Sequence, residues 1–121
     1  MKNSKTDRKY DLEERTLSFA KIVRDFIKKL PKNTFNLEYS KQLVRSSSSV
    51  GANYIEANEA ISKKDFLLRI KISRKEAKES NYWLHLIETD GKNDIDKEVG
   101  KLQRESIELM MIFSSIMRKS G

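Results

Sequence analysis

Five basic residues between residues 64 and 78 are spaced so that they fall on one side of a helix. They are Lys64, Lys71, Arg74, Lys75 and Lys78, and Tyr82 and His85 continue the row. Side chains separated by about two, three or four whole turns share a helix face. A row of cations that ends in an aromatic ring can follow a nucleic-acid backbone. We therefore predict that the five cations and Tyr82 bind nucleic acid. The alternative is a solvated lysine-rich face whose charge is diluted by Glu76 and Glu79.

A second polar set lies upstream and consists of Arg45, Ser49, Asn53 and Glu56. Arg45 and Glu56 are almost three helical turns apart, so both point in nearly the same direction. Three turns is too far for a direct contact within one helix, so each charge is expected to meet a partner on another helix or subunit. Two interpretations stay open. In the first, these residues are charges at the edge of the helix interface that bridge neighbouring helices. In the second, they form a buried network that fixes the register of the helices in the bundle or the geometry of an oligomer interface.

Groups for catalysis or metal binding are scarce. The sequence has no cysteine and one histidine, which excludes disulfides, thiol catalysis and cysteine or paired-histidine metal sites. The serines at 46–49 have no base nearby in the sequence, and no glycine-rich phosphate loop is present. We therefore predict that the protein is not an enzyme and uses neither a cofactor nor a metal.

Charge is distributed unevenly along the 121 residues, whose formal net charge is +7. Residues 1–36 hold ten Lys/Arg against five Asp/Glu, whereas residues 37–61 hold two against three. The basic start of the chain (Lys2, Lys5, Arg8, Lys9) favours a nucleic-acid partner over a membrane surface, because the basic helices need their apolar faces for packing. No apolar run is long enough to span a bilayer, and the first residues lack the apolar core of a signal peptide. The expected location is cytoplasmic.

Apolar residues recur at steps of three and four along four segments, which predicts helices at about 11–30, 37–61, 63–90 and 94–118. Pro31 is expected to end the first helix, Asn36 and Ser62 to cap the next two, and Gly91 to stop the third. No segment alternates with a period of two, so strands are not expected. Short connections make consecutive helices antiparallel. The prediction is one all-α domain over residues 1–121, an antiparallel up-down-up-down four-helix bundle.

The second helix carries two rows of different character. One is apolar and includes Leu43, Val50, Tyr54, Ala57 and Ile61, and the other is small and polar and includes Ser46, Ser49 and Asn53. Small residues let another backbone approach closely, and a buried polar row needs hydrogen-bond partners. Gly51 suits such an approach, whereas Gly100 in the fourth helix has no evident packing reason.

The second-helix motif Gln42-Leu43-x-Arg45-x-x-x-Ser49-Val50-x-x-Asn53-x-Ile55-Glu56 resembles a family of small bacterial four-helix-bundle proteins. These proteins are encoded in intervening sequences of large-subunit ribosomal RNA genes. The resemblance runs from about Leu17 to Met117 and includes Leu30-Pro31 and Lys64-Asp65-Phe66. Two positions depart from the family's pattern: Ala57 stands where glycine is usual, and Glu76 where serine is common.

The resemblance implies an antiparallel four-helix bundle whose relatives assemble into five-fold rings. More distantly, the chain is similar to the accessory variability protein of diversity-generating retroelements, a basic ring that binds nucleic acid and a reverse transcriptase. Arg45, Ser49, Asn53 and Glu56 would be the family's polar positions on the second helix.

Two functions follow as expectations. The first is a non-enzymatic, homo-oligomeric accessory protein, with the five subunits that the resemblance implies, that associates with nucleic acid and specifically with RNA. The second is a protein–protein interaction scaffold that binds no nucleic acid. In the second, the small polar row of the second helix would be the assembly surface.

Overall fold

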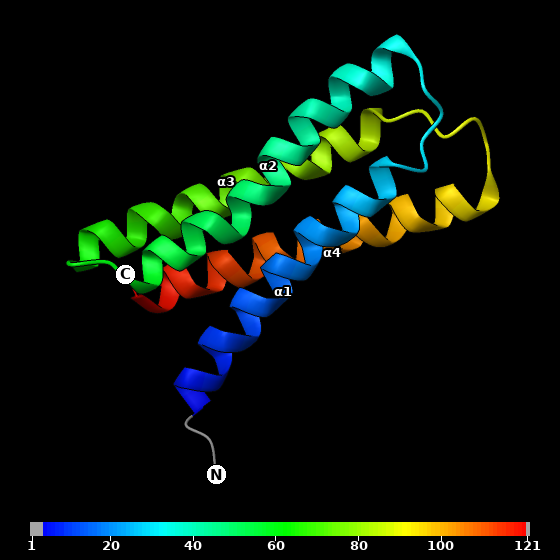
Figure 1. Ribbon diagram of the computed structural model, residues 1–121. Coiled ribbons are helices and arrows are strands. Elements are labelled where there is room, and N and C mark those ends of the chain that lie inside the picture. The colour runs from blue at the N-terminus through cyan, green and yellow to red at the C-terminus, as the bar shows by residue number, and fades with distance from the viewer. Residues whose placement is uncertain (1–3, 121) are drawn as a thin grey trace.

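The computed structural model describes the backbone of residues 4–120 and the side chains of residues 11–120. Over this range it contains four helices, α1 (Ser4–Ile27), α2 (Thr34–Asn58), α3 (Lys63–Leu86) and α4 (Asn93–Ser120). Consecutive helices run antiparallel, and residues 4–120 contain no strand (Figure 1). The predicted all-α four-helix bundle is confirmed.

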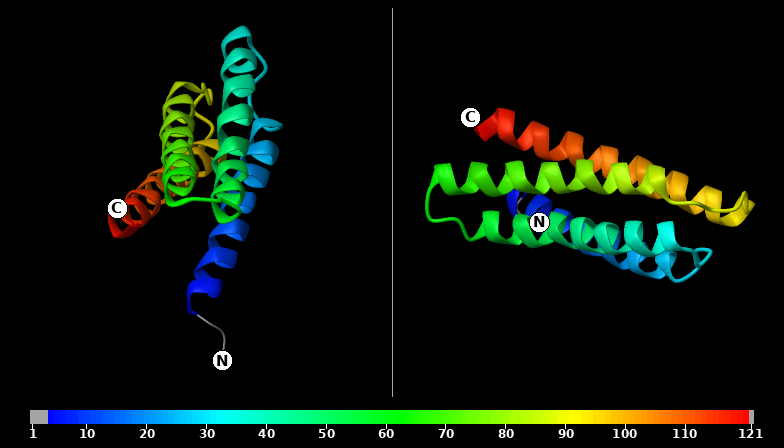
Figure 2. Two further views of the ribbon diagram at one scale, coloured as in Figure 1. Left: turned by 90° about the vertical axis from the view of Figure 1, so that its left-hand side faces the viewer. Right: turned by 90° about the horizontal axis from the view of Figure 1, so that it is seen from above.

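The four helices do not contact one another equally. α2 packs along α1 and α3, and α3 also packs along α4, whereas α1 and α4 touch over a short stretch. Figure 2 shows the N-terminal half of α1 and the C-terminal half of α4 diverging. Among the described residues, α2 and α4 make no close backbone approach. These two helices therefore occupy opposite corners of the bundle.

The apolar rows of the helices meet in one core. Its largest fully buried side chains include Phe19, Phe26, Phe113, Leu43, Ile70, Leu84 and Leu109. Ile61 is an exception, because α2 ends at Asn58 and Ile61 lies in the connection to α3, where it is 96% exposed. The prediction that Ile61 continues the apolar row is wrong.

The small polar row of α2 faces α3 within the same chain. The hydroxyl groups of Ser46 and Ser80 are hydrogen-bonded across the interface at 2.8 Å, and Ser73 Oγ donates to the carbonyl of Val50 at 2.8 Å. Among the described side chains, no buried nitrogen or oxygen lacks a hydrogen-bond partner. Small side chains thus let α2 and α3 approach closely without leaving polar groups unpaired.

Gly51 lies where α1 crosses α2. A Cβ atom at this position would lie 2.8 Å from Thr16 Oγ1 and 3.1 Å from Thr16 Cβ, both of which are shorter than ordinary van der Waals contact. Gly100 differs, because an added Cβ would meet a single neighbour, the Arg104 guanidinium end at 3.5 Å. The close approach explains Gly51, and nothing in the structure explains Gly100.

Several predicted helix ends are wrong. The N-cap of α2 is Asn33, whose side chain accepts a hydrogen bond from Asn36 N at 2.8 Å, rather than Asn36 itself. α3 ends at Leu86, and Gly91 instead forms a turn with Asp90 in which both residues have positive φ. Ser62 caps α3 as predicted, because its Oγ accepts from Asp65 N at 3.0 Å.

Asn36 links the two connections at one end of the bundle. Its Nδ2 donates to the carbonyl of Pro31 at 2.8 Å and to that of Glu88 at 2.9 Å, and its Oδ1 accepts from Glu88 N at 2.9 Å. The side chain is 3% exposed. The α1–α2 connection is therefore fastened to the residues that follow α3.

Candidate nucleic-acid interface

α3 is a two-sided helix. Its buried side consists of Ile70, Ser73, Ala77, Ser80 and Leu84, which pack between α2 and α4. Residues on the opposite side of the helix face away from the core, because a helix repeats every 3.6 residues, whereas Trp83, at the flank, is partly buried against it. The basic residues occupy that outer side.

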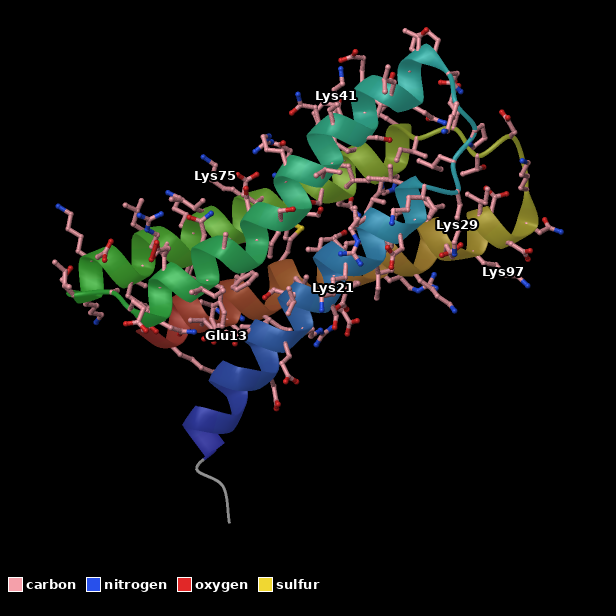
Figure 3. The ribbon with its side chains drawn as sticks, viewed as in Figure 1. Glu13, Lys21, Lys29, Lys41, Lys75 and Lys97 are labelled. Atoms are coloured by element: carbon pink, nitrogen blue, oxygen red, sulfur yellow. The ribbon has the colours of Figure 1, made fainter. Side chains whose placement is uncertain are left out.

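The structure brings the predicted basic row together on the surface of α3. Lys64, Lys71, Lys75 and Lys78 are exposed, Arg74 is half-buried, and Tyr82 is 59% exposed at the C-terminal end of the row. We call Lys64, Lys71, Arg74, Lys75 and Lys78 the α3 basic stripe. Lys75 is labelled in Figure 3, where its side chain projects away from the helices. None of the five cations lies within 4.0 Å of a carboxylate among the side chains of residues 11–120.

The acids next to the stripe point to the other side of α3. Arg45 on α2 donates from Nη1 to both carboxylate oxygens of Glu76 at 3.2 Å, and its Nη2 forms an ion pair with Glu79. Glu79 also accepts a hydrogen bond from Trp83 Nε1 at 3.0 Å. Both carboxylates therefore contact Arg45 rather than a cation of the α3 basic stripe, and Arg45 offsets one of their two negative charges.

The polar set on α2 is divided in the structure. Arg45 bridges α2 to α3, and Ser49 Oγ donates to the Arg45 carbonyl at 2.8 Å. Asn53 donates to the Ser49 carbonyl at 2.9 Å and accepts from Arg69 Nη1 on α3 at 3.1 Å. Glu56 is exposed. The structure therefore does not bring Arg45, Asn53 and Glu56 into one buried network.

An aromatic row crosses from α2 to α3, and sequence reasoning missed it. Phe35 stacks on Tyr39 with centroids 6.4 Å apart, Tyr39 stacks on Trp83 at 6.1 Å, and Tyr82 meets Trp83 in a T-shaped contact at 5.1 Å. The spacing of Phe35 and Tyr39 and the adjacent Tyr82 and Trp83 were visible in the sequence. The contact between the two pairs depends on how α2 and α3 pack.

Comparison with known proteins identifies the family. The sequence profile described as 23S rRNA-intervening sequence protein matches residues 8–115. The chain belongs to this family. No curated protein matches the chain.

A solved member of the S23 ribosomal protein family from Bacteroides thetaiotaomicron, a protein of unknown function, is similar in sequence and structure. The two share 30% identity with a TM-score of 0.78, over 91% of this chain and 97% of the other. The family assignment rests on the chain's whole bundle, because the matched region includes parts of all four helices.

This member of the 23S rRNA-intervening sequence protein family offers little for acid–base or metal chemistry in the described residues. Burial raises the pKa of Tyr54, and a hydrogen bond to Glu105 raises that of Arg15. Both shifts preserve the ordinary charge at neutral pH, so neither group becomes an acid or base there. His85 is exposed, and its Nδ1 donates to the Asn81 carbonyl at 2.8 Å.

Two further predictions concern metals and membranes. Across residues 11–120 no group of three or more His, Asp or Glu side chains is placed to hold a metal ion. None of the helices, over the part of the chain described, is long and apolar enough to cross a membrane. The basic residues Lys2, Lys5, Arg8 and Lys9 lie outside the described side chains.

Proposed function

We propose that the protein is a non-catalytic RNA-associated protein of the 23S rRNA-intervening sequence family that acts as a homo-oligomer. The observation that carries the RNA-binding part is the α3 basic stripe. Its cations share one outer surface, and the two acids nearest to them in the sequence form their ion pairs with Arg45 instead. Free cations along a helix match the phosphates of a nucleic-acid strand, and their release of counterions favours binding. We choose RNA over DNA as the polymer because the family is linked to 23S ribosomal RNA.

Reversing the charge of Lys71, Lys75 and Lys78 to glutamate is expected to weaken RNA binding by at least about tenfold at moderate salt, because phosphate contacts supply most non-specific affinity. The slope of log affinity against log salt should become shallower by about 2, since each lost phosphate contact removes about 0.7 on single strands. Fluorescence anisotropy with labelled RNA across a salt titration measures both quantities.

The matched control is the triple variant of Lys21, Lys92 and Lys97 to glutamate. These lysines are exposed on other parts of the bundle, and the variant has the same change in net charge. The control should keep the parental salt slope. Equal losses in the two triple variants would show that net charge rather than the α3 basic stripe attracts RNA. Absence of binding at low salt would overturn the RNA-binding proposal.

The homo-oligomer is supported by two exposed apolar patches on opposite corners of the bundle. The α2 patch consists of Leu37, Val44 and Ile55, which are 59%, 45% and 51% exposed. The α4 patch consists of Ile107 and Met111, which are 45% and 65% exposed beside a shallow hollow lined by Met110, Ser114, Ser115 and Arg118. A closed ring needs two different complementary surfaces on each subunit. The stoichiometry we propose is the five implied by the resemblance.

Charge placed in either patch is expected to open the ring. We predict that Val44→Glu with Ile55→Glu, and separately Ile107→Glu with Met111→Glu, give monomers by light scattering, because buried unpaired carboxylates are strongly unfavourable. Mixing the two variants should restore one intact contact and produce a heterodimer. Leu68→Glu, at a 55% exposed position on α3, is the control and should leave the assembly unchanged. An unaltered oligomer in both double variants would exclude these patches as the contact surfaces.

The alternative of a protein scaffold is less well supported in its original form. Its assembly surface was the small polar row of α2, and that row packs against α3 of the same chain through Ser46 and Ser80. A scaffold function would have to use the α2 or α4 patch instead.

A further inference from the structure

We propose that Tyr82 is a stacking platform for an unpaired nucleobase, so that the protein recognises single-stranded or looped RNA rather than a continuous duplex. This inference rests on the proposed RNA binding and names the RNA structure that the same surface would take. The supporting observation is that the ring of Tyr82 is exposed, is held in place by Trp83, and lies at the end of the α3 basic stripe.

The ring of Tyr82 is available for contact. It is 59% exposed and lies on the same outer side of α3 as the basic stripe, one turn after Lys78 and two turns after Lys75. A strand whose phosphates follow Lys75 and Lys78 would therefore pass beside the ring. Cations that hold the backbone and an aromatic face that holds a base are the two components of single-strand recognition.

The ring is also held in place from behind. Trp83 meets Tyr82 in a T-shaped contact with centroids 5.1 Å apart and an interplanar angle of 73°. Trp83 is fixed in turn by its hydrogen bond to Glu79, which is paired with Arg45 on α2, and by stacking on Tyr39. Because the neighbours of Tyr82 are already ordered, stacking a base on the ring requires little further ordering of the protein.

A perfect duplex would not use this ring. Bases in an A-form helix are stacked on their neighbours, so their faces are covered and the protein meets phosphates, 2′-hydroxyls and groove edges. An unpaired base in a loop, bulge or single strand has a free face to place on the ring. The α3 basic stripe can contact the phosphates of both duplex and single-stranded RNA, whereas Tyr82 can stack only on a base that is unpaired.

The test measures the affinity of Tyr82→Leu and of the parent for two single-stranded RNAs of equal length. One RNA has all its bases, and the other has abasic sites but the same number of phosphates. Leucine retains an apolar, helix-forming side chain but removes the aromatic face. The loss expected on the normal strand is about five- to 150-fold, the range that corresponds to one stacked base. On the abasic strand the two proteins should bind equally. Tyr82→Phe should retain the parental affinity for both strands.

Phe35→Leu is the matched control. Phe35 ends the same aromatic row and is equally exposed at 58%, but it lies on α2 near Glu38 and away from the basic stripe. This control should bind the normal strand as the parent does. Trp83 is the sole tryptophan and lies beside Tyr82, so quenching of its fluorescence by the normal strand and not by the abasic strand would show that a base is held next to this pair of rings.

The outcomes separate the inference from the proposed function. If the lysine triple variant loses RNA affinity but Tyr82→Leu and the abasic strand do not, RNA binding stands and the stacking role of Tyr82 is wrong. Equal losses in Tyr82→Leu and Phe35→Leu would also overturn the assignment of Tyr82. If the parent binds no RNA at low salt, the proposed function and this inference fail together. Binding of a protein to the aromatic row under those conditions would identify it as a protein-docking surface instead.

Discussion

Replacement of Asn36 by leucine is expected to lower the free energy of unfolding by about 3 kcal/mol, since each buried hydrogen bond contributes about 1 kcal/mol. The side chain makes three hydrogen bonds to backbone groups of Pro31 and Glu88, in two connections that are far apart in sequence. Leucine has a similar volume, so the loss arises from unpaired polar groups rather than from a cavity. Urea unfolding followed by far-UV circular dichroism measures the change. The corresponding decrease in Tm is about 10 °C.

Asn33→Ala provides the control for this prediction. Asn33 lies in the same connection and caps α2 through one hydrogen bond to Asn36 N at 2.8 Å. Loss of such a cap costs about 1 kcal/mol. A smaller effect of Asn36→Leu than of Asn33→Ala would mean that the two connections do not depend on the Asn36 side chain.

Substitution of alanine for the two glycines inside helices is expected to have opposite effects on stability. At Gly51 the new Cβ would lie 2.8 Å from Thr16 Oγ1, so α1 must move away from α2, at a cost of about 1–3 kcal/mol. At Gly100 the nearest atom is the flexible end of Arg104 at 3.5 Å, so the higher helix propensity of alanine should stabilise by about 0.5–1 kcal/mol. Chemical unfolding of both variants gives the two signs.

A second substitution tests the cause assigned to Gly51. Thr16→Ala removes the Oγ1 that the new Cβ would meet, although it also removes that hydroxyl's hydrogen bond to the Leu12 carbonyl at 2.9 Å. The double variant Gly51→Ala with Thr16→Ala should therefore be more stable than the sum of the single effects predicts. Strict additivity would argue against a clash between these two residues.

The helices could be predicted from the sequence, but their ends could not be predicted reliably. The apolar steps along residues such as Phe19, Val23 and Phe26 carry a strong signal, because a helix with one buried face must repeat every 3.6 residues. The position of a helix end depends on weaker signals, because neighbouring residues can have similar capping ability. Asn33 and Asn36 are both good caps by type, and the choice was decided by the backbone groups that only the folded connections bring near Asn36.

In the candidate site, too, the features set by spacing along one helix were predictable, and those set by contacts between helices were not. The α3 basic stripe follows from spacing along one helix, and the structure places its cations on one surface as that spacing requires. The direction of Glu76 and Glu79 was not predictable, because it is set by Arg45, which is 31 residues from Glu76. The aromatic row was missed for the same reason, since Tyr39 and Trp83 meet only when α2 and α3 pack.

The pairing of Arg45 with Glu76 and Glu79 separates two roles of α3, which are to hold the bundle together and to present cations on its surface. Acids on one edge of the helix are tied to the fold, while cations on the opposite edge form no ion pair with the described side chains. The number and sign of charges along the outer edge can therefore change during evolution with little cost to folding. The bundle can remain the same while the affinity and the choice of ligand of this surface diverge.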